Sequence, residues 1–127
     1  SEPARVERKR GRELPGHKPG EMNTTERRYL ETVIDPEVMT GQILEWAFEA
    51  VRLRLAPRTW WLPDFAIWRP APARLELVDV KGSRPEEQAQ RVKIKVAADR
   101  YPCWLFVVAR LRSRQDGGGF TREEINP

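Results

Sequence analysis

Hydrophobic positions along the chain predict a helix near its beginning and strands after it. Residues 24–33 carry apolar side chains at helical spacing behind an N-capping residue, Asn23 or Thr24. We expect this helix to end before Pro36, because the residue that precedes a proline avoids the helical region. Residues 51–55 alternate strictly between apolar and basic side chains, and this alternation predicts a half-buried strand.

The rest of the chain alternates between strand and helix patterns. Residues 41–56 are ambiguous, since their first half also fits a helix, whereas residues 60–68 and 75–81 predict two strands joined by a proline-containing turn. A helix is expected to reach Tyr101, and residues 103–109 form a continuous apolar run that is typical of a buried strand. The predicted order is helix, three strands, helix, strand: an α/β domain with a mixed central sheet flanked by helices.

The two ends of the chain differ from this central part. Residues 1–22 are charged and rich in proline and glycine, so we expect a disordered basic arm, and residues 113–127 predict a flexible tail. A single domain over residues 23–112 remains. The single cysteine, Cys103, rules out an intramolecular disulfide and is expected to be buried and inert.

Composition narrows the class of protein only modestly. The formal net charge of +4 is compatible with an anionic partner such as a nucleic acid, but many basic proteins bind none. No apolar run approaches the roughly 20 residues that a membrane-spanning helix needs. We therefore expect a cytoplasmic protein without membrane contact.

Two acidic residues and one lysine are the strongest candidates for chemistry. Asp64 follows Pro63 within one predicted strand region, and Asp79 and Lys81 end the next strand. Side chains two apart in a strand point to the same face, so Asp79 and Lys81 are expected side by side. If the two strands pair, this surface holds two carboxylates, which favour a divalent cation between them, and Mg²⁺ prefers oxygen ligands. Taken singly, these residues are better explained as turn and strand-edge residues, and only their combination favours a metal site.

Pro63-Asp64 followed by Asp79-Val80-Lys81 resembles the signature of the PD-(D/E)XK nuclease superfamily: Pro-Asp, a gap, then Asp or Glu, any residue, and Lys. The surrounding sequence over residues 24–110 is similar to a small phage-associated family within it. The resemblance implies a restriction-endonuclease-like αβββαβ core. It also implies that Asp64, Asp79 and the Val80 carbonyl bind the metal and that Asp64, Asp79 and Lys81 are catalytic.

The resemblance extends to residues outside the signature. Glu26, on the first helix, would complete the catalytic site, although a first-turn glutamate is equally explained by the helix dipole. Superfamily members often bring a Gln or Lys from the helix after the signature, which points to Gln88, Lys93 or Lys95. Lys93 and Lys95 project about 200° apart on a helix, so at least one is expected to face solvent. We expect Lys93, Lys95 and Arg84 to contact nucleic acid.

Two further placements follow from strand alternation. Glu76 is expected on the face opposite Asp79, and of the adjacent Trp60 and Trp61 one is expected to face outward. The outward tryptophan could stack on an unpaired base or pack against protein.

The pattern as a whole predicts a Mg²⁺-dependent DNA endonuclease in which Mn²⁺ can substitute. The resemblance implies DNA processing for a phage or prophage. We expect branched or single-stranded DNA as substrate, because a short chain has little surface for reading a long sequence. Many small nucleases of this fold are dimers, so a homodimer is open. The alternatives are a non-catalytic nucleic-acid-binding module on the same fold and a structural, partner-binding protein.

Overall fold

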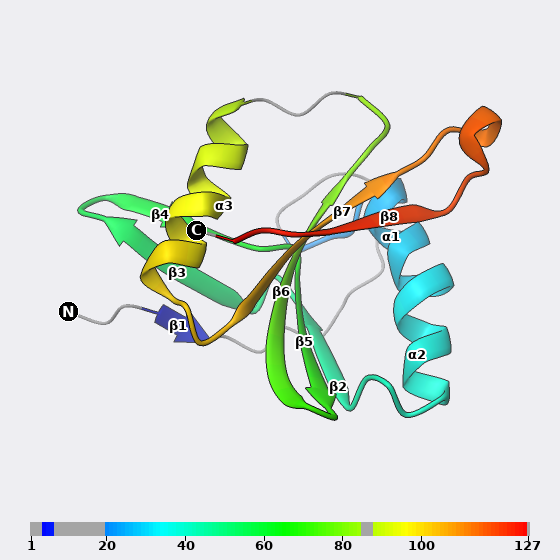
Figure 1. Ribbon diagram of the computed structural model, residues 1–127, viewed down its shortest axis with the longest axis horizontal. Coiled ribbons are helices and arrows are strands. Elements are labelled where there is room, and N and C mark those ends of the chain that lie inside the picture. The colour runs from blue at the N-terminus through cyan, green and yellow to red at the C-terminus, as the bar shows by residue number, and fades with distance from the viewer. Residues whose placement is uncertain (1–3, 7–19, 85–87, 127) are drawn as a thin grey trace.

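Two β-sheets and three α-helices make up the part of the chain that the computed structural model describes, residues 4–6, 20–84 and 88–126 (Figure 1). The larger sheet has the strand order β2-β5-β6-β7-β8, and the smaller has the order β1-β3-β4. The strands of the larger sheet are β2 (Glu45–Phe48), β5 (Phe65–Pro70), β6 (Ala73–Lys81), β7 (Leu105–Leu111) and β8 (Phe120–Glu124). Those of the smaller sheet are β1 (Ala4–Val6), β3 (Val51–Ala56) and β4 (Thr59–Trp61).

The larger sheet contains both antiparallel and parallel strand pairs. Its neighbouring strands are antiparallel except β6 and β7, which run parallel. Helix α3 (Gln88–Arg100) lies between these two strands in sequence, as a parallel connection requires. The prediction of an α/β protein with a mixed sheet flanked by helices is confirmed.

A continuous helical segment covers one face of the larger sheet: α1 (Thr24–Tyr29), a π-helical turn η1 (Leu30–Ile34) and α2 (Asp35–Met39). Its beginning is fixed by reciprocal hydrogen bonds. The Asn23 side chain accepts from the Glu26 backbone N–H at 2.8 Å, and Glu26 Oε1 accepts from the Asn23 N–H at 2.9 Å. This capping box satisfies two N–H groups that the helix leaves without a partner.

The expectation that this helix ends before Pro36 is wrong. Pro36 lies in the first turn of α2, where a helix tolerates the missing N–H. In the preceding π-helical turn the Asp35 N–H donates to the Leu30 carbonyl, five residues back. The wider turn accommodates the proline, so the helical segment continues past it.

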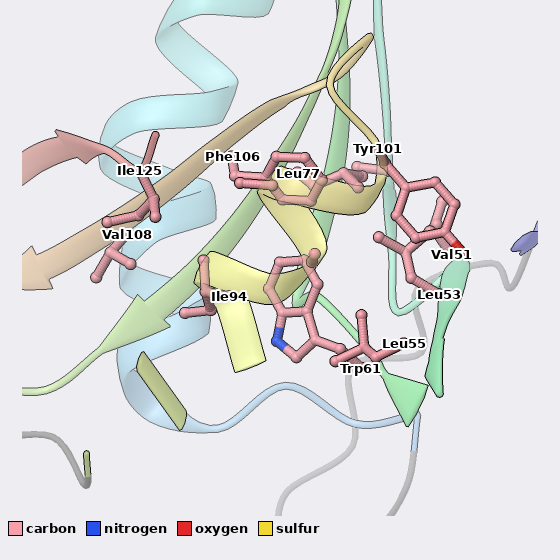
Figure 2. Close-up of a cluster of buried hydrophobic side chains, with 13 residues drawn as sticks. Val51, Leu53, Leu55, Trp61, Leu77, Ile94, Tyr101, Phe106, Val108 and Ile125 are labelled. Carbon is pink, nitrogen blue, oxygen red and sulfur yellow. The ribbon is translucent and has the colours of Figure 1, made fainter. Parts of the chain in front are cut away.

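Each face of the larger sheet carries its own hydrophobic core. On one face, Val78 and Val80 pack with side chains from the capped helical segment, including Tyr29, Leu30 and Ile34. On the other face, Leu77 packs with α3 and the smaller sheet. Figure 2 shows this second core, which is built from Val51, Leu53, Leu55, Trp61, Leu77, Ile94, Tyr101, Phe106, Val108 and Ile125. The period-two alternation of β6 therefore separates the two cores, as expected for Val78 and Val80.

The strands of the first half are more divided than predicted. The ambiguous residues 41–56 give β2 in one sheet and β3 in the other, and Glu49 between them adopts a positive φ of 50°. The predicted strand 60–68 is likewise split into β4 and β5 around Pro63 and Asp64. Apolar residues lie on both sides of each break, so the hydrophobic pattern does not reveal that the chain changes sheets there.

The expected flexible tail, residues 113–127, is wrong over most of its length. After a 3₁₀ turn η2 (Arg114–Asp116), β8 pairs antiparallel with β7, and Ile125 is buried in the second core. Gly117, Gly118 and Gly119 all have positive φ, so the glycines form the turn that returns the chain to the sheet. The side chains of β8 are mostly polar and exposed, so the hydrophobic pattern does not predict this strand. Its backbone pairing with β7 forms it.

The predicted basic arm, residues 1–22, is described only in part. Ala4–Val6 pair with β3, and Glu21 and Met22 are buried, so these residues are not a loose arm. Residues 1–3 and 7–19 lie outside the described part of the chain. Cys103 is exposed in the turn before β7, which corrects the expectation of a buried thiol. None of the helices in the described residues is long and apolar enough to span a membrane.

Candidate active site

The candidate site lies where β6 extends beyond the beginning of β5. The first residue of β5, Phe65, pairs with Val78, so the following part of β6 has no backbone partner in that strand. Pro63 has no N–H to offer there. Instead, Asp64 Oδ2 accepts a hydrogen bond from the Val80 N–H at 2.7 Å. The Pro-Asp sequence thus ends the pairing of two strands and fixes a carboxylate against the open edge of β6.

Asp79 and Lys81 lie side by side on β6, as the strand period predicted. Lys81 Nζ is 2.9 Å from Asp79 Oδ2, which is an ion pair, and the Asp79 residue is only 7% exposed. Apart from this ion pair, the same oxygen accepts no hydrogen bond within the described residues. Asp79 is therefore a buried carboxylate with unused acceptor capacity, which costs free energy in a folded protein.

Glu26 joins the two aspartates from α1. Burial raises the pKa of Asp64 well above its ordinary value, and the charges of Asp79 and Glu26 and a side-chain hydrogen bond with Glu26 raise it further. The Val80 N–H acts in the opposite direction, because it stabilises the ionised carboxylate. Three acidic side chains from α1, β6 and the start of β5 thus lie close enough to interact strongly.

Glu26 caps α1 and also lies next to Asp64, and its role in catalysis stays a prediction. Its Oε1 accepts the hydrogen bond that caps α1, and the residue is only 6% exposed. The same carboxylate is a neighbour of Asp64, whose proton affinity it raises. The capping box therefore also orients an acidic group toward the site.

The donor set fits a hard divalent cation. Carboxylates that repel one another favour a divalent cation between them, and the Asp79 oxygen without a hydrogen bond offers a further ligand atom. In a strand, the N–H and C=O of one residue point to the same edge, so the Val80 carbonyl is directed toward the side of Asp64. Asp64, Asp79 and Val80 are thus the residues that could hold Mg²⁺.

No ready-made cage of three or more His, Cys, Asp or Glu side chains is found among residues 20–84 and 88–126. Mg²⁺ does not require such a cage, since it retains waters and is often bound through one or two carboxylates together with substrate phosphates. The arrangement is accordingly compatible with a site that the substrate completes.

The residues predicted to contact nucleic acid lie at the protein surface. Arg84 and Lys95 are exposed, and Lys93 is half-buried. Ile94 between the two lysines is fully buried in the second core, so the lysines flank the contact of α3 with the sheet. Gln88 is exposed at the first turn of α3. The nucleic-acid-binding role of Lys93, Lys95 and Arg84 stays a prediction.

Arg110 is a basic residue beside the site that sequence reasoning missed. It is the register partner of Lys81 in the parallel pair of β6 and β7, so the two side chains share a face. Its NH1 donates to the Arg84 carbonyl at 2.9 Å and ties the loop after β6 to β7. In the sequence, Arg110 is recognisable only as a basic residue after an apolar run. Its position beside Lys81 follows from the register of β6 and β7.

Comparison with known proteins adds no relative: no protein-family model, curated protein or solved structure matches this chain. The assignment of this site therefore depends on the signature residues and on the geometry described above.

Proposed function

We propose that this chain is a Mg²⁺-dependent DNA endonuclease of the PD-(D/E)XK type. The carrying observation is the convergence of Asp64 and Asp79, with Glu26 beside them and Lys81 Nζ 2.9 Å from Asp79. The element order gives further support. An N-terminal helix, the antiparallel strands β2, β5 and β6, the helix α3 and the parallel strand β7 correspond to an αβββαβ core.

The protein residues divide the work as follows. Asp64 and Asp79, with the Val80 carbonyl, hold the metal, and the Val80 N–H keeps Asp64 in place. Bound Mg²⁺ would supply a Lewis acid that polarises the phosphate and lowers the pKa of a water molecule. Lys81 stabilises the negative charge that develops on the phosphate oxygens, or positions the attacking water. Asp79 orients the Lys81 ammonium, and Glu26 lies beside Asp64 as a further acidic group.

For the substrate we propose branched or single-stranded DNA in phage or prophage DNA processing. The net charge of +4 and the basic residues Lys81 and Arg110 on one face of the sheet favour a polyanion. A homodimer, which would bring two such sites to two strands, belongs to the same proposal.

Cleavage assays test the proposal. Wild-type protein is incubated with single-stranded, duplex and four-way-junction DNA in Mg²⁺, Mn²⁺ or EDTA, alongside Asp79→Asn and Lys81→Met. We expect cleavage with either metal and none in EDTA. Each variant should cleave at least about 100-fold more slowly, because it removes a group that acts on transition-state charge.

Glu123→Gln, at an exposed ion pair with Arg91, serves as the matched control and should cleave normally. A thermal melt in Mg²⁺ and in EDTA separates loss of metal binding from loss of folding. Asp79→Asn should remain folded but lose the stabilisation by Mg²⁺. Full Mg²⁺-dependent cleavage by Asp79→Asn would refute the assignment.

The second candidate is a non-catalytic nucleic-acid-binding module on the same fold. Two contacts favour it: the Asp79 carboxylate is already paired with Lys81, and Asp64 already accepts from Val80. Both acids are thus partly satisfied by protein groups. This alternative predicts DNA binding in EDTA, no cleavage in any metal, and the same response to Mg²⁺ in wild type and Asp64→Asn.

A further inference from the structure

The outer face of the smaller sheet combines an indole with arginine side chains. Strand β4 turns Trp61 into the second core, where it lies among Ile94, Leu77 and Phe106 (Figure 2). Because adjacent side chains of a strand point to opposite faces, Trp60 faces away from this core. Trp60 is half-buried, and the guanidinium carbon of Arg52 lies 4.1 Å from the centroid of its ring.

Further positive charge surrounds this pair. Arg54 is the register partner of Trp60 on β3 and therefore shares its face. Arg58 is exposed in the turn that joins the two strands and has a positive φ of 59°. Core packing explains the apolar residues on the inner face of this sheet. It does not explain why an indole on the outer face is placed among three arginines.

We propose that Arg52 and Trp60 form a stacking site for an unpaired base of single-stranded DNA. Indole rings and guanidinium planes both stack on bases, and stacking tolerates any base because each has a π-face. Arg54 and Arg58 supply the charge that attracts the adjoining phosphates. Duplex DNA does not fit this chemistry, since its bases are already stacked on one another.

The position of the pair links it to the candidate active site. Trp60 precedes Asp64 by four residues, a length of chain that reaches at most about 14 Å. Of the three residues between them, Leu62 is 45% exposed, whereas Trp61 and Pro63 are buried. A strand held at Trp60 would therefore lie near the carboxylates. The inference names the substrate of the proposed nuclease and in that respect rests on the proposed function.

Binding in EDTA tests the inference independently of cleavage. Fluorescence anisotropy of labelled oligothymidylate and of a blunt duplex is measured with wild type, Trp60→Ala, Trp60→Phe and Arg52→Gln. Trp60→Ala should weaken single-strand binding by roughly 5- to 100-fold, the range for loss of one stacked base, and leave duplex binding unchanged. Trp60→Phe should retain most of the single-strand affinity. The affinity of Arg52→Gln should lie between those of Trp60→Ala and Trp60→Phe.

Intrinsic fluorescence supplies a second readout. Oligothymidylate should quench the tryptophan emission of wild type, and Trp60→Phe should lose this quenching. Trp46→Phe, which alters a half-buried indole on β2 of the other sheet, is the matched control and should retain it.

The outcomes separate the two proposals. Unchanged single-strand affinity in Trp60→Ala, or no binding of oligothymidylate by wild type, overturns the stacking site whether or not the protein cleaves duplex DNA. If binding depends on Trp60 but no Mg²⁺-dependent cleavage occurs, the stacking site is supported and the proposed nuclease activity is refuted.

Discussion

Two buried carboxylates on opposite faces of β6 are in contrasting environments. Glu76 is 0% exposed and Asp79 is 7% exposed, and they are only three residues apart. Glu76 lies on the face opposite Asp79, as strand alternation predicted, and two arginines, Arg69 and Arg122, donate hydrogen bonds to it. Asp79 faces the other side, where it pairs with Lys81 at 2.9 Å and its charge acts on Asp64. The same strand therefore holds one carboxylate that is fully hydrogen-bonded and one that has only an ion pair with Lys81 at its buried oxygen.

The environment of Glu76 is fully paired. Its two oxygens accept four hydrogen bonds, from Nε and NH2 of Arg69 and from NH1 and NH2 of Arg122, over distances of 2.6 to 3.4 Å. Burial by itself would raise the pKa of Glu76, but the hydrogen bonds and charges of Arg122 and Arg69 outweigh it and hold the pKa below its ordinary value. Arg69 also pairs with Glu37 at 2.8 Å, so the cluster joins α2, β5, β6 and β8.

The cluster also affects Tyr29 on α1. Burial raises the pKa of the Tyr29 phenol far above its ordinary value, and the charge of Glu76 raises it further. Tyr29 accordingly remains a neutral, packed side chain, and its ring contacts Phe65 and Phe120. The polar groups around Glu76 satisfy one another and hold the elements together. Around Asp79, by contrast, one carboxylate oxygen has no hydrogen bond and could bind a ligand. Complete pairing thus indicates a structural role for Glu76, whereas Asp79 keeps the oxygen that the proposed metal site requires.

The largest expected effect comes from Glu76. Glu76→Gln removes the charge that compensates two arginines and should lower the free energy of unfolding by about 3–5 kcal/mol. Chemical denaturation at neutral pH measures this loss. Glu123→Gln, at the exposed pair with Arg91, should cost less than about 1 kcal/mol. If Glu76→Gln loses no more stability than Glu123→Gln, the buried Glu76 cluster contributes no more to stability than an exposed ion pair.

The pH dependence of Glu76 has a defined sign. Because the folded-state pKa of Glu76 is lowered, its contribution to stability is complete above its unfolded pKa and disappears as the pH falls through the folded value. The stability difference between wild type and Glu76→Gln should therefore shrink on acidification.

Asp64 should show a smaller effect of opposite sign. Its folded-state pKa is raised, so its contribution to stability is complete below its unfolded pKa and is lost as the pH rises through the folded value. Asp64→Asn retains an acceptor for the Val80 N–H and removes the repulsion. In EDTA at neutral pH it should be roughly 0.5–2 kcal/mol more stable than wild type, as is usual when a functional site is relieved of strain.

Thermal melts of Asp64→Asn from acid to neutral pH measure this gain, with Asp99→Asn at an exposed position of α3 as the control. The gain should be small in acid and grow toward neutral pH. If Asp64→Asn is less stable than wild type at neutral pH in EDTA, the acidic cluster is not a source of strain.

The smallest expected effect concerns the helix lysines. Lys95→Gln should weaken binding to all DNA forms by a few fold. It should also reduce the slope of log affinity against log salt concentration by about 1, the value for one lost phosphate contact. Titrations of wild type and variant at several salt concentrations provide the slope. The exposed residue Gln115, changed to Asn, serves as a control outside α3. An unchanged slope would leave Lys95 as a solvated side chain.

The sequence determined most of the element order and the polarity of β6. Period-two alternation predicted that Asp79 and Lys81 share a face and that Glu76 and Val78 lie on the other, because side-chain direction in a strand follows from local backbone geometry. Apolar spacing likewise predicted the strand regions of β5, β6 and β7 and the helix α3. Local patterns did not reveal the two sheet changes, the helix beyond Pro36 or the strand β8.

Contacts between distant residues depend on how the strands and helices pack. The Arg69–Glu76–Arg122 cluster joins three strands, and the approach of Glu26 to Asp64 depends on where α1 docks on the sheet. The contact between Asp64 and Val80 similarly depends on where β5 begins in the register. Sequence fixes the chemistry and local direction of each side chain. Register and docking, which depend on packing across the whole core, decide whether its charge is neutralised or left available.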